Sequence, residues 1–208
     1  MFDSLVVISH FLREHAAFFI TLSAIFGLMI GSFLNVVIHR LPKMMEREWR
    51  RNCQELKGEE AATEAKYNLV VPRSACPGCG HKITALENIP VLSYVFLRGK
   101  CSGCKTHISA RYPLVEVLTG ALVGLIAWQF GYSSLTVAAW IFTFALIALT
   151  FIDFDTFLLP DGITFPLLWL GLLYNLNGGF TTIQSAVLGA VAGYLILWSI
   201  YWLFKLVT

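Results

Sequence analysis

The stretch LTVAAWIFTFALIALTFIDFDTFLLPD, residues 135–161, decides the fold of this chain. It begins with a long run that contains no charged residue, and a helix that spans a bilayer needs about 20 predominantly apolar residues. The run ends in three aspartates, Asp153, Asp155 and Asp161. A carboxylate at the edge of a membrane helix is costly unless it has a function. The stretch therefore predicts a membrane helix that carries a functional Asp153.

Similar runs occur elsewhere in the 208 residues, of which 57% are hydrophobic and only 13% charged. A soluble domain of this size is normally about a quarter charged. With the run at 135–152, the candidate spans are residues 17–38, 114–130, 163–176 and 183–204. The first run is too long for the apolar part of a signal peptide and lacks a basic leader, so we expect a retained anchor. The composition predicts an all-α polytopic membrane protein with about five transmembrane helices.

The basic residues predict the orientation of these spans. Of the 15 lysines and arginines, 13 lie between residues 40 and 111. The positive-inside rule places this insert in the cytoplasm. The loops at 131–134 and 175–179 contain no basic residue and should lie outside. We therefore expect the N-terminus outside, the C-terminus inside, and Asp153 at the cytoplasmic face.

The insert contains two CxxC pairs separated by 21 residues, namely Cys76, Cys79, Cys101 and Cys104. Two such turns can complete a tetrahedral metal site, which predicts a structural zinc ion in a small zinc-ribbon-like domain. Disulfides are the first alternative, although they rarely persist in a reducing cytoplasm. A redox motif is the second, although one CxxC in a βαβ setting would be expected for it.

Other residues of the insert are interpreted as structural. Cys53 lies in a highly charged stretch that should form a solvated helix or a flexible arm, and His81 and His107 should not bind the metal. Short strands are expected around residues 91–97. The predicted domains are an anchor at 1–39, a zinc-binding domain at 40–112 and a helical bundle at 113–208, with Asp153 facing the bundle interior.

Three segments occur in a fixed order: GSFLNVVIHRLP at 31–42, NIPVLSYVFLRGKC at 88–101 between the CxxC pairs, and FIDFDTFLLPD at 151–161. In the first, Gly31 and Ser32 allow close helix packing, and Arg40 alone would indicate a side chain that snorkels to the interface. Together the segments closely resemble the type IV prepilin peptidases of type IV pilus and type II secretion systems. The resemblance covers the chain from about residue 30 onward.

The resemblance implies a bacterial inner-membrane aspartyl peptidase. It implies cleavage of the leader from prepilins or pseudopilins, followed by methylation of the new N-terminus with S-adenosylmethionine. Asp153 matches the first catalytic aspartate of the family. Gly99 and Lys100 match positions implicated in the methyltransferase, so they are expected to bind the cofactor. The partners would be the substrates and the lipid bilayer, and no nucleic acid is expected.

The family's second catalytic aspartate lies in a G-x-G-D motif, which this sequence does not contain. The first explanation is a chain truncated before that motif. The alternatives are a short form that keeps only methyltransferase activity, or a dyad in which Asp161 substitutes. A separate hypothesis is a non-catalytic, membrane-anchored zinc-ribbon scaffold that binds a partner.

Overall fold

A computed structural model describes residues 2–59 and 65–207, which fold into helices joined by loops. In order, the helices are α1 (Phe2–Glu14), α2 (Ala16–Leu56), the 3-10 turn η1 (Leu86–Asn88), α3 (Leu92–Phe96), α4 (Arg111–Phe130), α5 (Ser134–Thr156), α6 (Asp161–Asn175) and α7 (Ile183–Val207). The described residues contain isolated β-bridges but no strand. The all-α prediction is therefore confirmed.

Within the described residues, four helices are long and apolar enough to cross a membrane, namely α2, α4, α5 and α7. They coincide with four of the five predicted spans. The remaining predicted span corresponds to α6, which has 15 residues. At a rise of 1.5 Å per residue, α6 is about 22 Å long, which is less than the roughly 30 Å of a bilayer core.

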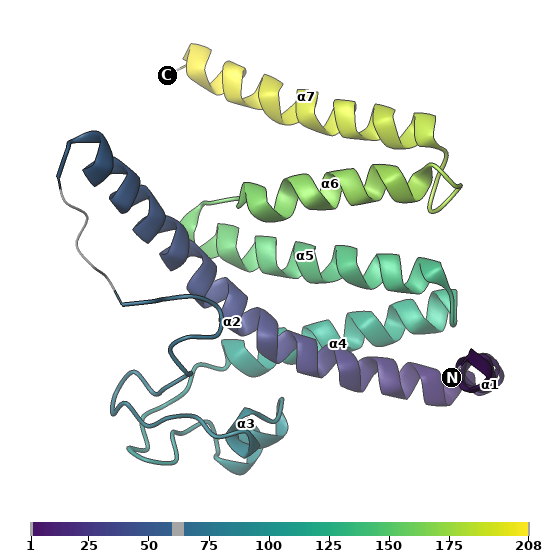
Figure 1. Cartoon of the computed structure of the whole chain (residues 1–208), viewed down its shortest axis with the longest axis horizontal. Coiled ribbons are helices and arrows are strands. Elements are labelled where there is room, and N and C mark those ends of the chain that lie inside the picture. Colours follow the sequence, from purple (N-terminus) through teal and green to yellow (C-terminus); the bar gives the residue numbers. More distant parts are fainter. Residues whose placement is uncertain (1, 60–64, 208) are drawn as a thin grey trace. The chain divides into compact units, whose positions relative to one another are not determined.

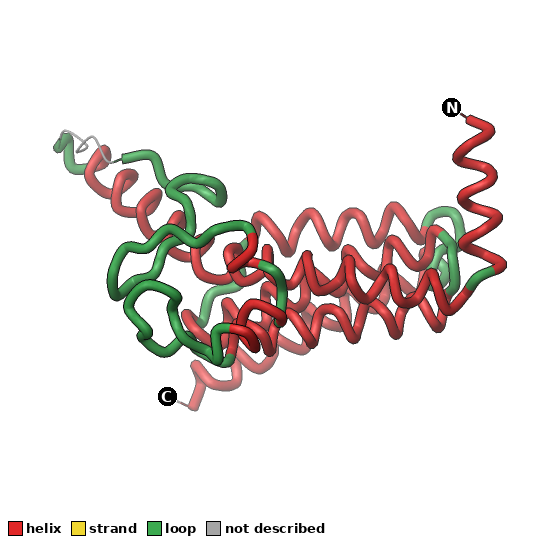
Figure 2. The backbone as a smooth tube through the Cα atoms, turned by 90° about the horizontal axis from the view of Figure 1, so that it is seen from below, coloured by secondary structure: helices red, strands yellow, loops and turns green. Residues whose placement is uncertain are grey.

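The chain divides into two compact units, residues 1–160 and 161–208. In the first unit α2, α4 and α5 lie side by side, and α1 runs across the start of α2 (Figures 1 and 2). The side chains of Val115, Val123 and Ile152 are fully buried between these helices. The second unit is the helical hairpin of α6 and α7.

Helix α2 continues far past the predicted end of the anchor. Its 41 residues, at 1.5 Å each, extend about 60 Å, roughly twice a bilayer core. Pro42 lies inside the helix without ending it. The sequence left open whether the charged stretch around Cys53 is a helix or a flexible arm. The structure shows a helix.

The contact between α2 and α4 depends on glycines in both helices. Gly27 and Gly31 lie four residues apart in α2, and Gly120 and Gly124 do so in α4. A Cβ added at Gly27 would lie 2.9 Å from Gly120 Cα, and one added at Gly31 would lie 2.7 Å from Glu116 Cα. This spacing of small residues lets membrane helices approach closely. The close packing expected from Gly31 is confirmed.

Replacing Gly27 with leucine is expected to destabilise this helix pair, because the new side chain would collide with Val123 Cβ, 2.8 Å from the added Cβ. Overpacking of this kind costs about 1–3 kcal/mol. For a chain of this size we expect a fall of roughly 4–8 °C in the midpoint of thermal unfolding in detergent, the shift expected for about 2 kcal/mol. Gly189→Leu in α7 is the control, since nothing lies within 4 Å of an added Cβ there. Equal shifts for both variants would contradict the prediction.

Candidate functional site

Four sulfur atoms converge in the loop domain between α2 and α4, which Figure 2 shows as loops at one end of the long helices. The Sγ atoms of Cys76, Cys79, Cys101 and Cys104 all lie within 4.8 Å of one another. Cys76 Sγ lies 3.7 Å from Cys104 Sγ, and Cys79 Sγ lies 4.0 Å from Cys101 Sγ. A tetrahedral zinc ion with sulfur ligands at about 2.3 Å requires sulfur–sulfur distances of about 3.8 Å. The four donors therefore fit a metal ion, and no disulfide links them.

The pKa values of two of the thiols shift in opposite directions. Hydrogen bonds with Thr106 lower the pKa of Cys104 to about 6. The hydrogen bond from the His81 backbone lowers the pKa of Cys79, but its contacts with the other thiols outweigh this and the pKa rises to about 11. Four thiolates at these distances repel one another, so they coexist only around a positive ion.

The two CxxC segments fold into the same turn. Gly80 N donates to Cys76 O at 2.9 Å in the first, and Lys105 N donates to Cys101 O at 3.1 Å in the second. Gly80 and Lys105, at equivalent positions, have φ values of +71° and +61°. Each turn is flanked by an isolated bridge. The spacing in the sequence thus produces two matched halves of one site.

Glu87 in η1 connects the two turns. Its carboxylate lies 3.1 Å from His81 Nε2 and accepts a short hydrogen bond from the Ser102 hydroxyl. It also accepts from Thr84 N at 2.8 Å. The bond from Ser102, followed by those from Thr84 and His81, lowers the pKa of Glu87 to about 2. The imidazole of His81 therefore interacts with Glu87.

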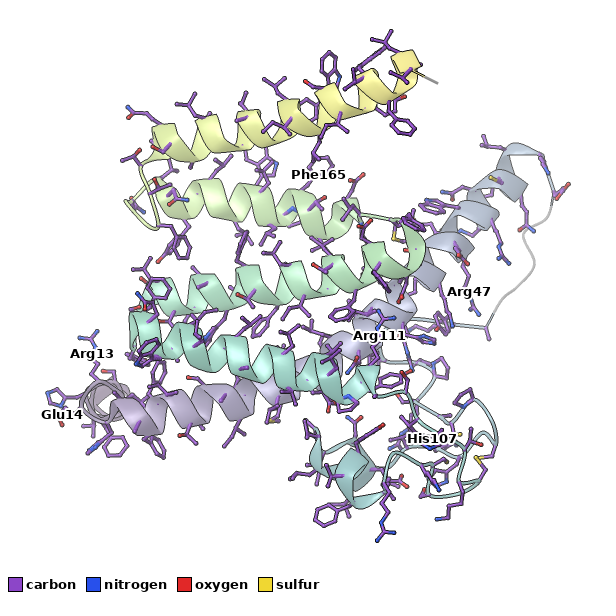
Figure 3. The ribbon with its side chains drawn as sticks, turned by 180° about the vertical axis from the view of Figure 1, so that it is seen from behind. Arg13, Glu14, Arg47, His107, Arg111 and Phe165 are labelled. Atoms are coloured by element: carbon purple, nitrogen blue, oxygen red, sulfur yellow. The ribbon has the colours of Figure 1, made fainter. Side chains whose placement is uncertain are left out.

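Gly99 and Lys100, the expected cofactor residues, lie directly before the second turn. Gly99 is buried with φ +66°, and a Cβ added there would lie 2.8 Å from Tyr94 Oη. Lys100 is exposed and forms a bridge with His107, whose side chain is labelled in Figure 3 and stands outside the sulfur cluster. The fold itself thus requires glycine at 99, whereas the Lys100 ammonium is available to a ligand.

The aspartates at the end of α5 have different surroundings. Asp155 Oδ1 accepts from Arg111 Nη1 at 2.6 Å, and Arg111 Nη2 donates to Phe151 O at 3.2 Å. Asp153 is exposed, and among the described residues its carboxylate has no hydrogen bond or ion pair. Residues two apart on an α-helix point about 200° from each other. Asp155 therefore faces α4 through Arg111, labelled in Figure 3, while Asp153 faces away.

The expectation that Asp153 faces the interior of a bundle formed by all the spans stays a prediction, because α6 and α7 belong to the other unit. Within the first unit, the positions buried against α2 and α4 near this end of α5 are Leu149 and Ile152. Asp161 begins α6 in the other unit.

The motif at the end of the first span is structural in this fold. Asn35 Nδ2 donates to Tyr112 O at 3.0 Å, which ties α2 to the start of α4. Arg40 is only 7% exposed and donates to Asn68 O at 2.9 Å. The prediction of a snorkelling Arg40 is therefore wrong, because the loop after α2 folds back and supplies a carbonyl acceptor.

Glu116 is a buried, hydrogen-bonded carboxylate that the sequence reasoning missed. It lies in α4 with 8% exposure, and Val91 N donates to its Oε2 at 2.7 Å. Ser32 of α2 hydrogen-bonds to the same carboxylate. The sequence did contain a signal for it, because Glu116 lies inside the predicted span at residues 114–130 and acidic residues within membrane spans are rare unless they have a function.

The sequence of the chain is similar to those of known proteins over most of its length. Residues 25–130 match the bacterial peptidase A24 N-terminal domain, and residues 140–207 match the type IV leader peptidase family. A prepilin leader peptidase/N-methyltransferase of Aeromonas hydrophila is 57% identical over 192 residues, which are 91% of this chain and 66% of that protein. Proteins of the same name from Pseudomonas aeruginosa and Neisseria gonorrhoeae are 52% and 54% identical, over 95% and 92% of this chain and 69% and 68% of theirs.

No solved structure matches the chain. The chain spans 66% of the length of the Aeromonas relatives, slightly less than two thirds. Between them the two family matches cover both the cysteine turns and the aspartates of α5. On this evidence the chain belongs to the type IV leader peptidase family.

Proposed function

We propose that this chain is a membrane aspartic peptidase that removes the leader from type IV prepilins or pseudopilins and N-methylates the new N-terminus. The relatives that are 52–57% identical to it over the aligned residues are named for both activities. The observation that carries the proposal is the carboxylate of Asp153, which is exposed at the end of a membrane helix without a partner among the described residues.

Asp153 would supply one carboxylate of the catalytic pair. In an aspartic peptidase one carboxylate takes a proton from water as the water attacks the scissile carbonyl, and the other donates a proton to the carbonyl oxygen. Asp155 does not fit as the partner, because it points away from Asp153 and is ion-paired with Arg111. The second carboxylate must approach Asp153 from another direction, and Asp161 or a residue of the G-x-G-D type are the candidates.

The four cysteines would hold zinc as a structural ion. Four thiolates leave no open coordination position, so the metal would stabilise the loop domain and not take part in the reaction. The positive-inside rule supports a cytoplasmic position for this domain and for the end of α5, in the inner membrane.

For the methyltransferase activity, S-adenosylmethionine would donate the methyl group near Gly99 and Lys100. The exposed Lys100 ammonium suits the binding of a carboxylate, either of the cofactor or of an acidic substrate residue. Gly99 would act indirectly, by allowing the close contact with Tyr94 that sets the position of Lys100.

We expect Lys100→Gln to lower methylation about tenfold or more, the loss that corresponds to a charge-assisted hydrogen bond of about 1.5–3 kcal/mol. Cleavage of the same substrate should change little, since Asp153 is unaffected. Mass spectrometry of the peptide products measures both steps in one assay. Lys105→Gln, at another exposed lysine of the same turn, is the control. If Lys100→Gln lowers cleavage and methylation by the same factor, the assignment of Lys100 to the methylation step is wrong.

The overall proposal is tested by incubating membranes that contain the full chain with a synthetic prepilin peptide. A product shortened at the leader and heavier by one methyl group supports it. The competing hypothesis is a scaffold that binds a partner through the loop domain, and it is favoured by the absence of a carboxylate paired with Asp153 in the described residues. Failure of both reactions, with the metal still bound, would support the scaffold.

A further inference from the structure

The segment from η1 to α3 exposes several large apolar side chains on the loop domain. Its exposed members are Leu86 (76%), Ile89 (39%), Leu92 (55%), Val95 (65%) and Phe96 (81%), and we call them the α3 apolar surface. Leu92, Val95 and Phe96 are spaced i, i+3 and i+4, so they share one face of α3. Single exposed apolar residues are common, but a cluster of this kind indicates an interaction site.

The sequence predicted short strands for residues 91–97, and the structure contradicts this with the helix α3. Val91, the residue before α3, has φ +59°, and its N–H donates to Glu116. Because Pro90 and the unusual backbone at Val91 redirect the chain, the apolar residues that follow turn in a helix and do not alternate between two faces. The helix gathers Leu92, Val95 and Phe96 on one side.

The hydrogen bond to Glu116 fixes the depth of α3 relative to the membrane helices. Glu116 lies five residues after Arg111, where α4 begins, which is about 7.5 Å along the helix. The Arg111–Asp155 ion pair marks the polar end of α4 and α5. Figure 1 shows α3 below the start of α4, at the same end of that helix. Helices that lie in a membrane interface bury their apolar face about 5–10 Å deep, which matches this position.

The charges around α3 suit an anionic surface. Residues 66–111 contain seven basic residues and one acidic residue, Glu87, whose carboxylate is already hydrogen-bonded. Arg98 and Lys100 follow α3 directly, and both are exposed. Basic residues beside an apolar helix face are typical of segments that bind anionic lipid headgroups.

We propose that the α3 apolar surface inserts into the bilayer interface on the side of the cysteine domain, with Arg98 paired with anionic phospholipid headgroups. The insertion holds the metal-binding turns against the membrane surface. Glu116 acts as the connection between this element and α4, which explains a buried carboxylate at the α2–α4 contact. The inference concerns lipid as the occupant and does not depend on either enzymatic activity.

The test places a photoreactive residue on the surface. The full chain with Phe96→p-benzoylphenylalanine is reconstituted in nanodiscs of phosphatidylcholine and phosphatidylglycerol, irradiated, and analysed by intact mass. We expect lipid adducts. The matched control is Leu56→p-benzoylphenylalanine. Leu56 is 88% exposed, but it is the last residue of α2 and lies 16 residues beyond Arg40, away from the membrane-spanning part of that helix. We expect no lipid adduct there. Bound metal is measured in both variants to show that the domain is folded.

A second variant tests the charge. Arg98→Gln should lower the preference of the Phe96 adducts for phosphatidylglycerol about fivefold, the change that corresponds to about 1 kcal/mol for a basic residue near an anionic surface. Equal lipid labelling from positions 96 and 56 would overturn the proposal. So would labelling of a second protein chain or of an added prepilin peptide in place of lipid, because the occupant would then be a polypeptide. An unchanged lipid preference in Arg98→Gln would overturn the part that concerns the headgroups.

Discussion

Replacing Asp153 with asparagine is expected to abolish cleavage of a prepilin peptide by membranes that contain the full chain. Asparagine has the size of aspartate and leaves α5 intact, but it can neither accept nor donate the proton that the reaction transfers. General acid–base groups contribute about 10²–10⁴-fold to a rate, so we expect a fall of at least 10²-fold. The measurement is the rate of leader release, followed by mass spectrometry at equal amounts of membrane-bound protein.

The matched control for this variant is Asp155→Asn, two residues along the same helix. It breaks the ion pair with Arg111, in which both side chains are about one third exposed. Such pairs contribute about 0–1 kcal/mol, so the cleavage rate should fall less than about tenfold. Asp161→Asn tests the remaining candidate for the second carboxylate. Cleavage that survives in Asp153→Asn and is lost in Asp155→Asn would reverse the assignment of the two aspartates.

The two activities can be separated in the same variants. A peptide that already lacks its leader presents the free amine, so Asp153→Asn should still methylate it at the rate of the unaltered chain. Loss of methylation as well would indicate that the substitution disturbs the fold or the binding of the substrate, and the role of Asp153 in proton transfer would then lack support.

The membrane helices and the cysteine cluster were predictable from the sequence because their signals are local. A run of apolar residues must form a helix in a bilayer, where every backbone group needs an internal hydrogen bond. The two-residue spacer within each CxxC pair permits only a tight turn that directs both sulfurs to one point. The structure confirms helices long and apolar enough to cross a membrane at four of the predicted spans, and it confirms the convergence of the four thiols.

The remaining features depend on residues far apart in the chain. Burial of Arg40 needs the carbonyl of Asn68, and the difference between Asp153 and Asp155 needs Arg111. The helix α3 replaced the expected strands because its start is held by Glu116, 25 residues later. Local composition does not indicate any of these partners. Each polar side chain, taken alone, is typical of a membrane–water interface and does not show which residue it will contact.

Loss of a single ligand is expected to empty the metal site. In Cys76→Ser a thiolate is replaced by a hydroxyl that stays protonated at neutral pH and binds zinc poorly. We expect the metal content of the purified protein, measured by elemental analysis, to fall from about one ion per chain to less than about one tenth, since even residues that only support a ligand contribute 10–100-fold to metal affinity. Cys53→Ser is the control, because Cys53 is exposed on α2 and lies outside the cluster.

The same variant tests whether the metal stabilises only the loop domain. Between the two turns the described residues form η1, the five-residue α3 and loops, so few apolar contacts can replace the metal. Structural zinc contributes on the order of 10–16 kcal/mol to the folding of small domains, far more than such a segment can gain from burial. Limited proteolysis of Cys76→Ser should therefore cut within residues 72–110, while α2, α4 and α5 remain intact around Val115, Val123 and Ile152. If Cys76→Ser retains its metal, or if Cys53→Ser loses it, the assignment of the four ligands is wrong.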